Sequence, residues 1–271
     1  MPALWLAMAL LAADGGGLRF EGSVAAGGGY DSNLLVAPGA DAAGSTVASL
    51  SAAGGAGIDL SDAAFLYFGA ALDGAKFPTL PELDRTAAGA SMSLIVDLVG
   101  PLALVLGASG GYAWYADPAR SGAALTGRAT LRYRPVAWLT TRLGYSHVLR
   151  TAEDPVYGSS LDRVFGELEF RLARSTWVSI AGFGERGDAT YYRELLMTVA
   201  DTAPPPTTSA TVVAYEPYRA NATTLGFGVG LEQGIGGGFS VDLGATWRRT
   251  DTPDGAYSGP SATASVVWRW D

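Results

Sequence analysis

The sequence of 271 residues contains no cysteine, a single histidine and few charged residues. The absence of cysteine excludes a disulfide, a thiolate metal site and a cysteine nucleophile. Charged residues make up 16% of the chain, against about a quarter in ordinary soluble domains. Acidic residues outnumber basic ones and the formal net charge is −8, which argues against a general nucleic-acid-binding protein.

Long apolar runs are missing as well. After the N-terminal segment, no apolar stretch reaches the roughly 18 residues that a membrane-spanning helix requires. The mean hydropathy is nevertheless positive, at +0.19, and 37 residues are glycine. Two classes of protein combine these features. One is a soluble protein with a large core, and the other is a membrane β-barrel in which apolar and polar residues alternate.

The N-terminus begins with a short apolar run that ends in small residues at Ala13. We interpret residues 1–13 as a secretory signal peptide with cleavage near Ala13, although neither lysine nor arginine precedes the apolar run. The remaining residues, 14–271, are then expected to form a single domain.

Apolar and polar residues alternate with a period of two in about twelve segments, which is typical of β-strands with two different faces. In residues 125–134, for example, Leu131 and Tyr133 alternate with Arg132 and Arg134. Short and long connections between the predicted strands alternate along the chain. The short ones are 61–63, 99–101, 135–137, 174–175 and 234–238. The long ones are 31–45, 74–84, 117–121, 151–159, 187–221 and 251–259.

This arrangement predicts an all-β fold: a transmembrane up-and-down antiparallel β-barrel of about twelve strands, with short periplasmic turns and long outer loops. An even strand number places both chain ends on the periplasmic side of an outer membrane. A soluble β-sandwich or soluble barrel is the alternative, and it would turn the apolar face inward.

Aromatic residues near the segment ends favour the membrane interpretation, because outer-membrane barrels carry aromatic girdles at both lipid–water interfaces. Those near the short connections are Phe20, Phe65, Tyr133, Trp138, Phe170, Trp177, Phe239, Trp268 and Trp270. Those near the long connections are Tyr30, Tyr112, Trp114, Tyr145 and Trp247.

The last strand, residues 262–270, ends in Val-Val-Trp-Arg-Trp and resembles the closing strand of Gram-negative outer-membrane barrels of the porin-like type. The segment Tyr30-Asp31-Ser32-Asn33 is similar to the first strand-to-loop junction of barrels attached to polysaccharide-export and surface-assembly systems. The resemblance implies a barrel across the whole mature chain. It implies no activity.

Seven arginines fall on the polar face of three consecutive predicted strands and would form a basic wall inside a barrel. They are Arg128, Arg132, Arg134, Arg142, Arg150, Arg163 and Arg171. Acidic residues on the polar faces nearer the two chain ends are Asp59, Asp73, Asp97, Glu185, Glu232 and Asp242. Two interpretations stay open: a pore whose constriction orients polar or anionic solutes, and an internal ion-pair network that stiffens a narrow barrel.

The segment 187–221 is predicted to be one long outer loop that could dock a partner, fold over the mouth or extend its two strands. Its candidate partner-binding residues are Tyr191, Tyr192, Leu195, Leu196, Tyr215 and Tyr218. The single histidine, His147, lies on the apolar face. Because Leu149 occupies the place of the serine in the His-x-Ser arrangement of outer-membrane phospholipases, we expect no enzyme.

The sequence therefore leads to two functional hypotheses. The first is the membrane-embedded component of a cell-envelope complex for export or surface motility. The alternative is a passive or weakly anion-selective porin-like channel for small polar solutes. In both cases we expect contact with outer-membrane lipid and no nucleic acid, cofactor or metal. Envelope proteins are the expected partners of the first hypothesis, and the oligomeric state stays open.

Overall fold

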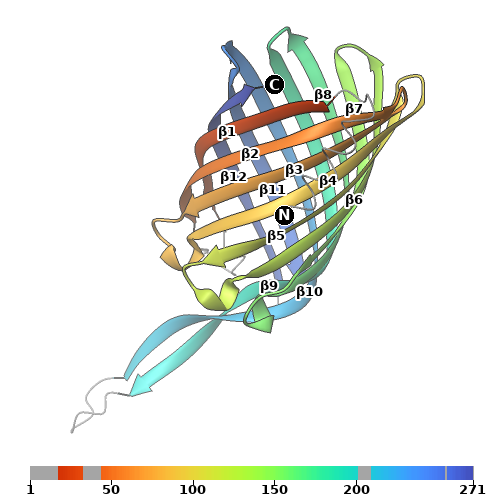
Figure 1. The fold of residues 1–271 in the computed structure, drawn as a ribbon. Coiled ribbons are helices and arrows are strands. Elements are labelled where there is room, and N and C mark those ends of the chain that lie inside the picture. Colours follow the sequence, from red (N-terminus) through yellow and green to blue (C-terminus); the bar gives the residue numbers. More distant parts are fainter. Residues whose placement is uncertain (1–17, 33–43, 201–208, 254, 271) are drawn as a thin grey trace.

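The computed structural model describes residues 18–32, 44–200, 209–253 and 255–270, with the backbone alone described for 192–200 and 209–216. Twelve strands close into one antiparallel barrel in which each strand pairs with its neighbours in sequence and β1 pairs with β12 (Figure 1). The predicted fold is confirmed. The strands are β1 (Leu18–Asp31), β2 (Ser45–Ser61), β3 (Ala64–Lys76), β4 (Arg85–Val99), β5 (Leu102–Tyr115), β6 (Gly122–Val136), β7 (Leu139–Arg150), β8 (Ser159–Ala173), β9 (Thr176–Ala200), β10 (Ser209–Gly236), β11 (Phe239–Thr252) and β12 (Gly255–Trp270).

The two faces of the wall differ as the alternation predicts. Across β6 and β7, Leu131 is opposite Leu143 and Arg132 is opposite Arg142. The leucines point outward and are 44% and 58% exposed, whereas both arginines line a cavity inside the barrel. Large apolar side chains therefore form the outer surface, which suits lipid and not water. The soluble alternative, with its apolar face inward, is wrong.

The two rims of the barrel are built differently. One rim, the short-turn rim, carries tight turns such as the one between β10 and β11. There Gly237 and Gly238 have φ values of 62° and 80°, a region that side chains rarely adopt. A Cβ on Gly238 would also lie 2.4 Å from the carbonyl oxygen of Arg269. Glycine is therefore required at this turn.

The opposite rim, the long-loop rim, carries three one-turn 3₁₀ helices. They are η1 (Pro81–Leu83), η2 (Pro118–Arg120) and η3 (Pro155–Tyr157). Asp117 and Asp154 cap η2 and η3, and their side chains accept hydrogen bonds from backbone N–H groups two residues later. The loops are joined to one another, because Asp117 N donates to Glu82 O (3.3 Å) and Asp154 N donates to Ala119 O (2.9 Å). This rim is thus a hydrogen-bonded series of loops. None of the helices in the described residues is long and apolar enough to span a membrane.

The segment 187–221 was predicted as one long outer connection that could extend its two strands, and most of it is paired as strands. Residues 188–200 pair in register with 209–221, so β9 and β10 continue as a hairpin that projects beyond the barrel (Figure 1). Of the three possibilities, the structure has the extended strands. Tyr191 and Tyr218 lie at the base of the hairpin with ring centroids 6.2 Å apart. The side chains of Tyr192, Leu195, Leu196 and Tyr215, and the expected signal peptide, lie outside the described residues.

The aromatic assignment needs one correction. Outward rings pair at the short-turn rim as a girdle should, with Trp138 and Phe170 6.5 Å apart. Phe65 and Trp177, however, stand on the lumen face. The guanidinium of Arg19 lies 5.9 Å from the Phe65 ring, and Trp177 lines an internal cavity. Both residues have odd numbers in strands whose outward residues are even, so position near a strand end outweighed parity in the prediction.

One carboxylate fastens the loop between β3 and β4 on the long-loop rim and gives a pH-dependent prediction. Asp84 accepts hydrogen bonds from Lys76 Nζ (2.8 Å) and Phe77 N (2.7 Å), and these bonds lower the pKa of Asp84 below its ordinary value of 3.8. A carboxyl group with a lowered pKa stabilises the folded loop above its unfolded pKa, and that contribution is lost as the pH falls through the lowered value.

In an acid titration of the detergent-solubilised protein, the Phe77 amide resonance should move with a midpoint below 3.8. In Asp84→Asn the same resonance should show no such transition. A midpoint at or above 3.8 would contradict the hydrogen-bonded loop.

Candidate functional site

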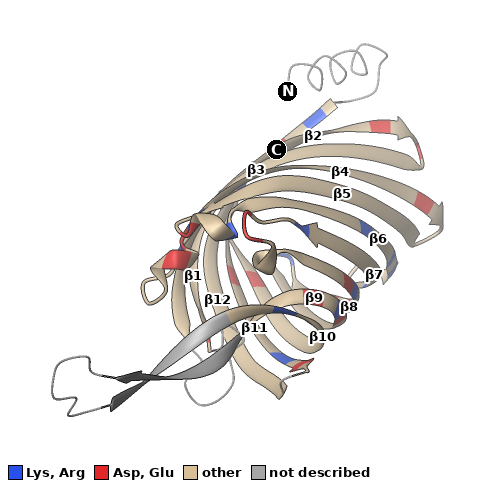
Figure 2. Ribbon diagram, turned by 90° about the horizontal axis from the view of Figure 1, so that it is seen from below, with Lys and Arg blue, Asp and Glu red and all other residues tan. Residues whose placement is uncertain are grey.

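The seven predicted arginines all stand on β6, β7 and β8, and Figure 2 colours basic residues blue. The structure places them at two levels of the lumen wall. The upper level, toward the long-loop rim, contains Arg128, Arg150 and Arg163. The lower level, toward the short-turn rim, contains Arg132, Arg134, Arg142 and Arg171. Only two glutamates, Glu167 and Glu169, share the lumen face of these three strands, so the wall is basic overall.

Aromatic rings hold the arginines of the upper level. The guanidinium carbon of Arg128 lies 4.3 Å from the ring centroid of Phe165, and that of Arg163 lies 3.9 Å from the centroid of Phe183. Two further arginines stack in this way: Arg150 on Tyr115 at 5.1 Å, and Arg171 on Trp177 at 5.5 Å. A ring face orients a cation and attracts it without cancelling its charge. These guanidinium groups are therefore fixed in place and still electrostatically active.

Glycines on the neighbouring strands make room for the rings. A Cβ on Gly144 of β7 would lie 2.3 Å from the Phe165 ring, and one on Gly226 of β10 would lie 2.4 Å from the Phe183 ring. Each ring thus occupies the space that the side chain of a larger residue would fill, because the neighbouring strand has glycine at that position. The aromatic–glycine contact brings the ring of one strand beneath an arginine of another.

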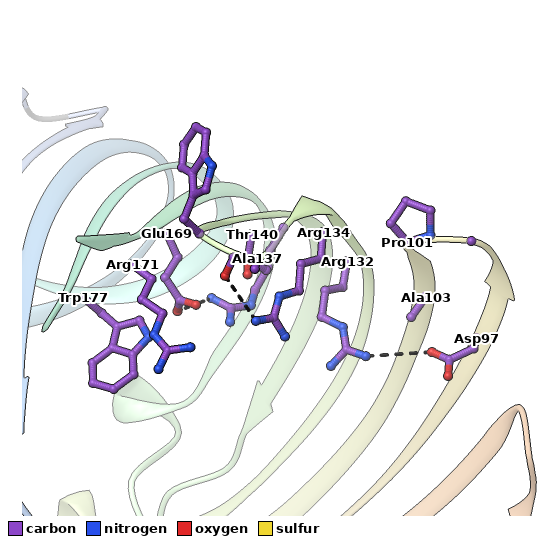
Figure 3. A pocket seen from close by; sticks show the side chains of 13 residues that line it. Asp97, Pro101, Ala103, Arg132, Arg134, Ala137, Thr140, Glu169, Arg171 and Trp177 are labelled. Atoms are coloured by element: carbon purple, nitrogen blue, oxygen red, sulfur yellow. Dashed lines mark hydrogen bonds and ion pairs between the residues drawn. The ribbon is translucent and has the colours of Figure 1, made fainter. Parts of the chain in front are cut away.

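The lower level surrounds a cavity of about 570 Å³ at the short-turn rim. Among its lining residues are Asp97, Arg132, Arg134, Thr140, Arg142, Glu169, Arg171 and Trp177 (Figure 3). In this cavity the arginines differ in their partners. Arg142 bridges Glu167 and Glu169, each at 3.1 Å, and Arg132 lies 3.9 Å from Asp97. Arg134 and Arg171 instead donate to backbone carbonyl oxygens.

The acidic residues also have basic neighbours. The pairs are Asp59–Arg19 (2.7 Å), Asp73–Arg85 (3.8 Å), Glu232–Arg269 (2.6 Å) and Asp242–Arg269 (3.6 Å). Glu185 interacts electrostatically with Arg163 and Arg248. Arg248 also binds Asp31 at 3.0 Å, which gives the aspartate of the Tyr-Asp-Ser-Asn junction a structural role. The ion pairs join near neighbours around the wall, so the lumen combines features of both interpretations.

Sequence reasoning left several of these charged residues out of the candidate site. Glu167, Glu169, Arg248 and Arg269 all point into the lumen and all pair there. The signal that could have found them was present, because each occupies a polar position of an alternating segment. The two glutamates matter most, since together they outweigh the positive charge of Arg142 in the middle of the predicted basic wall.

Small residues cover the wall next to the arginines. A second cavity, of about 360 Å³, is lined on β2 to β5 largely by glycine, alanine and serine, and it reaches Asp73 on one side and Arg150 on the other. Because these side chains are short, they leave space that long arginine side chains on the adjacent strands can occupy. The free volume of the lumen therefore lies beside the basic wall.

His147 lies outside this lumen. It faces outward, and its Nδ1 is 2.8 Å from Asp162 Oδ1, which also accepts a hydrogen bond from the Tyr145 hydroxyl. In the described part of the chain, His, Asp and Glu side chains form no group of three or more that could hold a metal ion.

No protein-family model and no curated protein matches the sequence. Solved structures do. A KdgM porin in complex with disordered oligogalacturonate matches with a TM-score of 0.54 and 7% identity, over 92% of this chain and 99% of that one. The COG4313 outer membrane channel from Pseudomonas putida F1 matches with a TM-score of 0.53 and 10% identity, over 93% of this chain and 95% of that one. A NanC porin matches with a TM-score of 0.51 and 9% identity, over 90% of this chain and 98% of that one. This chain has the fold of a porin-like outer-membrane barrel. At sequence identities of 10% or less, the structural similarity establishes the fold of this chain but not the substrate that it binds or conducts.

The contact between Gly144 and Phe165 leads to a stability prediction for the porin-like barrel. Gly144→Ala should lower the free energy of unfolding by about 1–3 kcal/mol, because the new methyl group overlaps the Phe165 ring and approaches the Ala129 carbonyl. Gly127→Ala is the matched control on the adjacent strand, since a Cβ there meets nothing within 4 Å. The control should change stability by less than about 0.5 kcal/mol. Urea unfolding followed by tryptophan fluorescence measures both, and equal effects would contradict the packing described.

The Arg142 bridge leads to a second prediction. Arg142→Gln leaves Glu167 and Glu169 without their shared cation in a partly exposed site, so we expect a loss of about 1–2 kcal/mol. Adding Glu167→Gln and Glu169→Gln to this variant should restore most of that loss, because no like charges then remain together. Urea unfolding of the single and triple variants tests this. A triple variant no more stable than Arg142→Gln would show that charge is not the cause.

Proposed function

We propose that this protein is an outer-membrane channel that conducts small polar solutes and prefers anions. The observation that carries the proposal is the state of the lumen arginines: Arg128, Arg150 and Arg171 stack on rings, and Arg134 is held by a carbonyl oxygen. No carboxylate of the described residues forms an ion pair with these four. Fixed, uncompensated cations in a confined aqueous space raise the local concentration of anions.

Three further points support a channel. The outer surface is apolar where lipid would lie, the lumen contains two cavities next to the basic wall, and the solved structures of similar fold are porins and channels. These points favour the channel over a component of an export or motility complex. In the membrane, we place the short turns and both chain ends on the periplasmic side, as the rule for such barrels requires.

The complex-component hypothesis keeps one supporting observation. The β9–β10 hairpin continues in register well beyond the neighbouring strands, and a projecting pair of strands offers backbone and side chains to another protein. A channel can carry such an extension as well. Conductance therefore separates the two hypotheses better than the shape of the hairpin does.

Planar-bilayer recording tests the proposed preference for anions. In a salt gradient, the wild-type protein should give a reversal potential on the anion-selective side. Arg128→Gln with Arg150→Gln should reduce the chloride-to-potassium permeability ratio by about twofold or more, because two unpaired lumen charges are removed.

The matched control is Arg249→Gln. This arginine belongs to the outward row of β11, opposite Leu225, and pairs with Asp251 at 3.2 Å, so its loss should leave the ratio unchanged. Absence of conductance from the wild-type protein, or a ratio equally sensitive to both changes, would refute the proposal.

A further inference from the structure

Arg134 and Arg171 occupy equivalent positions at the ends of β6 and β8. In each, Nη2 donates to the carbonyl oxygen of the third residue along the chain, which lies in the short turn that follows. The distances are 3.2 Å for Arg134 to Ala137 and 3.0 Å for Arg171 to Arg174. One N–H of each guanidinium is thereby used. An arginine has five N–H donors, so a pair remains on each side chain for a ligand.

Both side chains line the same cavity of about 570 Å³, and Figure 3 shows Arg171 beside Trp177 and Arg134 beside Arg132. Arg142 lies between their strands, but Glu167 and Glu169 both pair with it and together outweigh its single positive charge. Arg132 contacts Asp97 only at 3.9 Å. The cavity therefore presents two cationic positions, Arg134 and Arg171, that form no ion pair among the described residues, on either side of a strand whose arginine has no positive charge to spare.

The chemistry and the volume of this cavity favour a particular class of ligand. Guanidinium groups form paired, charge-assisted hydrogen bonds with carboxylates and phosphates, and the volume falls within the range of small-molecule sites, about 300–1,000 Å³. A solute with one charged group can satisfy one position. A solute with two can satisfy both without displacing either turn carbonyl.

We propose that this cavity is a binding site for a compact solute with two anionic oxygen groups, a dicarboxylate or a phosphorylated compound. One group binds Arg134 and the other binds Arg171, beside the Trp177 ring. The site rests on the proposed channel function and adds a place where the permeating anion pauses, at the short-turn mouth of the lumen.

Trp177 supplies a readout that is independent of conduction, because it lines the cavity and lies 5.5 Å from the guanidinium of Arg171. The detergent-solubilised protein is titrated at constant ionic strength and pH 7 with succinate, pyrophosphate and acetate. Saturable quenching of tryptophan fluorescence by succinate or pyrophosphate is expected, at a concentration at least about tenfold below that required for acetate. The order of succinate and pyrophosphate identifies which of the two anion chemistries the site prefers.

Three variants test whether the fluorescence quenching comes from anion binding at Arg134 and Arg171. Trp177→Phe should remove most of the quenching, with Trp138 as the other tryptophan that lines the cavity, and Arg134→Gln with Arg171→Gln should weaken the binding of the favoured anion by about tenfold or more. Arg249→Gln, on the outward row of β11, should bind as the wild type does. Equal apparent affinity for acetate and the dianions, or unchanged binding in the double variant, would overturn the site.

Bilayer recordings on the same preparations separate this proposal from the channel itself. An anion-selective conductance without saturable dianion binding refutes the site and leaves the channel standing. Saturable binding that depends on Arg134 and Arg171, without any conductance, supports the site and refutes the channel.

Discussion

Backbone hydrogen bonding in a medium without water is the constraint on which this structure depends. A strand exposed to lipid must pair its N–H and C=O groups with another strand on both sides, and only a closed barrel leaves none unpaired. Closure is made by β1 and β12, from Gly22 opposite Trp270 to Asp31 opposite Ser261. Once the wall is closed, alternation sends every second side chain into a confined interior. The apolar residues must then face lipid, and the charged residues must share the lumen.

The lumen accommodates its charges in two different ways. Arginines near carboxylates form ion pairs between adjacent or nearby strands, as Arg142 does with Glu167 and Glu169. Others lie on aromatic rings, as Arg128 does on Phe165. An ion pair removes a charge from the field that a solute meets, whereas a ring leaves it. Ion pairs therefore join neighbouring strands of the wall, whereas arginines that stack on rings without a carboxylate partner, such as Arg128, leave their part of the wall electropositive.

Much of the fold could be predicted because its signals are local. The period of two gave the strand number and the face of each residue, so Arg132 and Leu131 were assigned to opposite sides. Prediction failed where the parity of a residue was set aside, and it stayed open where the pairing of two strands decided the outcome. Phe65 and Trp177 were assigned by their nearness to a turn and point into the lumen. Residues 187–221 were left open between a loop and an extension of the two flanking strands, and only the pairing of β9 with β10 decides for the strands.

The sequence by itself determined a closed barrel with an apolar exterior and an arginine-rich sector, since these follow from composition and from alternation along single strands. Only the tertiary structure decided which arginines are neutralised. The register between strands puts Arg142 opposite Glu167, and the curvature of the wall brings Phe165 across Gly144 to Arg128. These contacts join side chains on different strands, and no local pattern specifies them. The distribution of charge available to a solute is therefore a property of the closed barrel and not of any one strand.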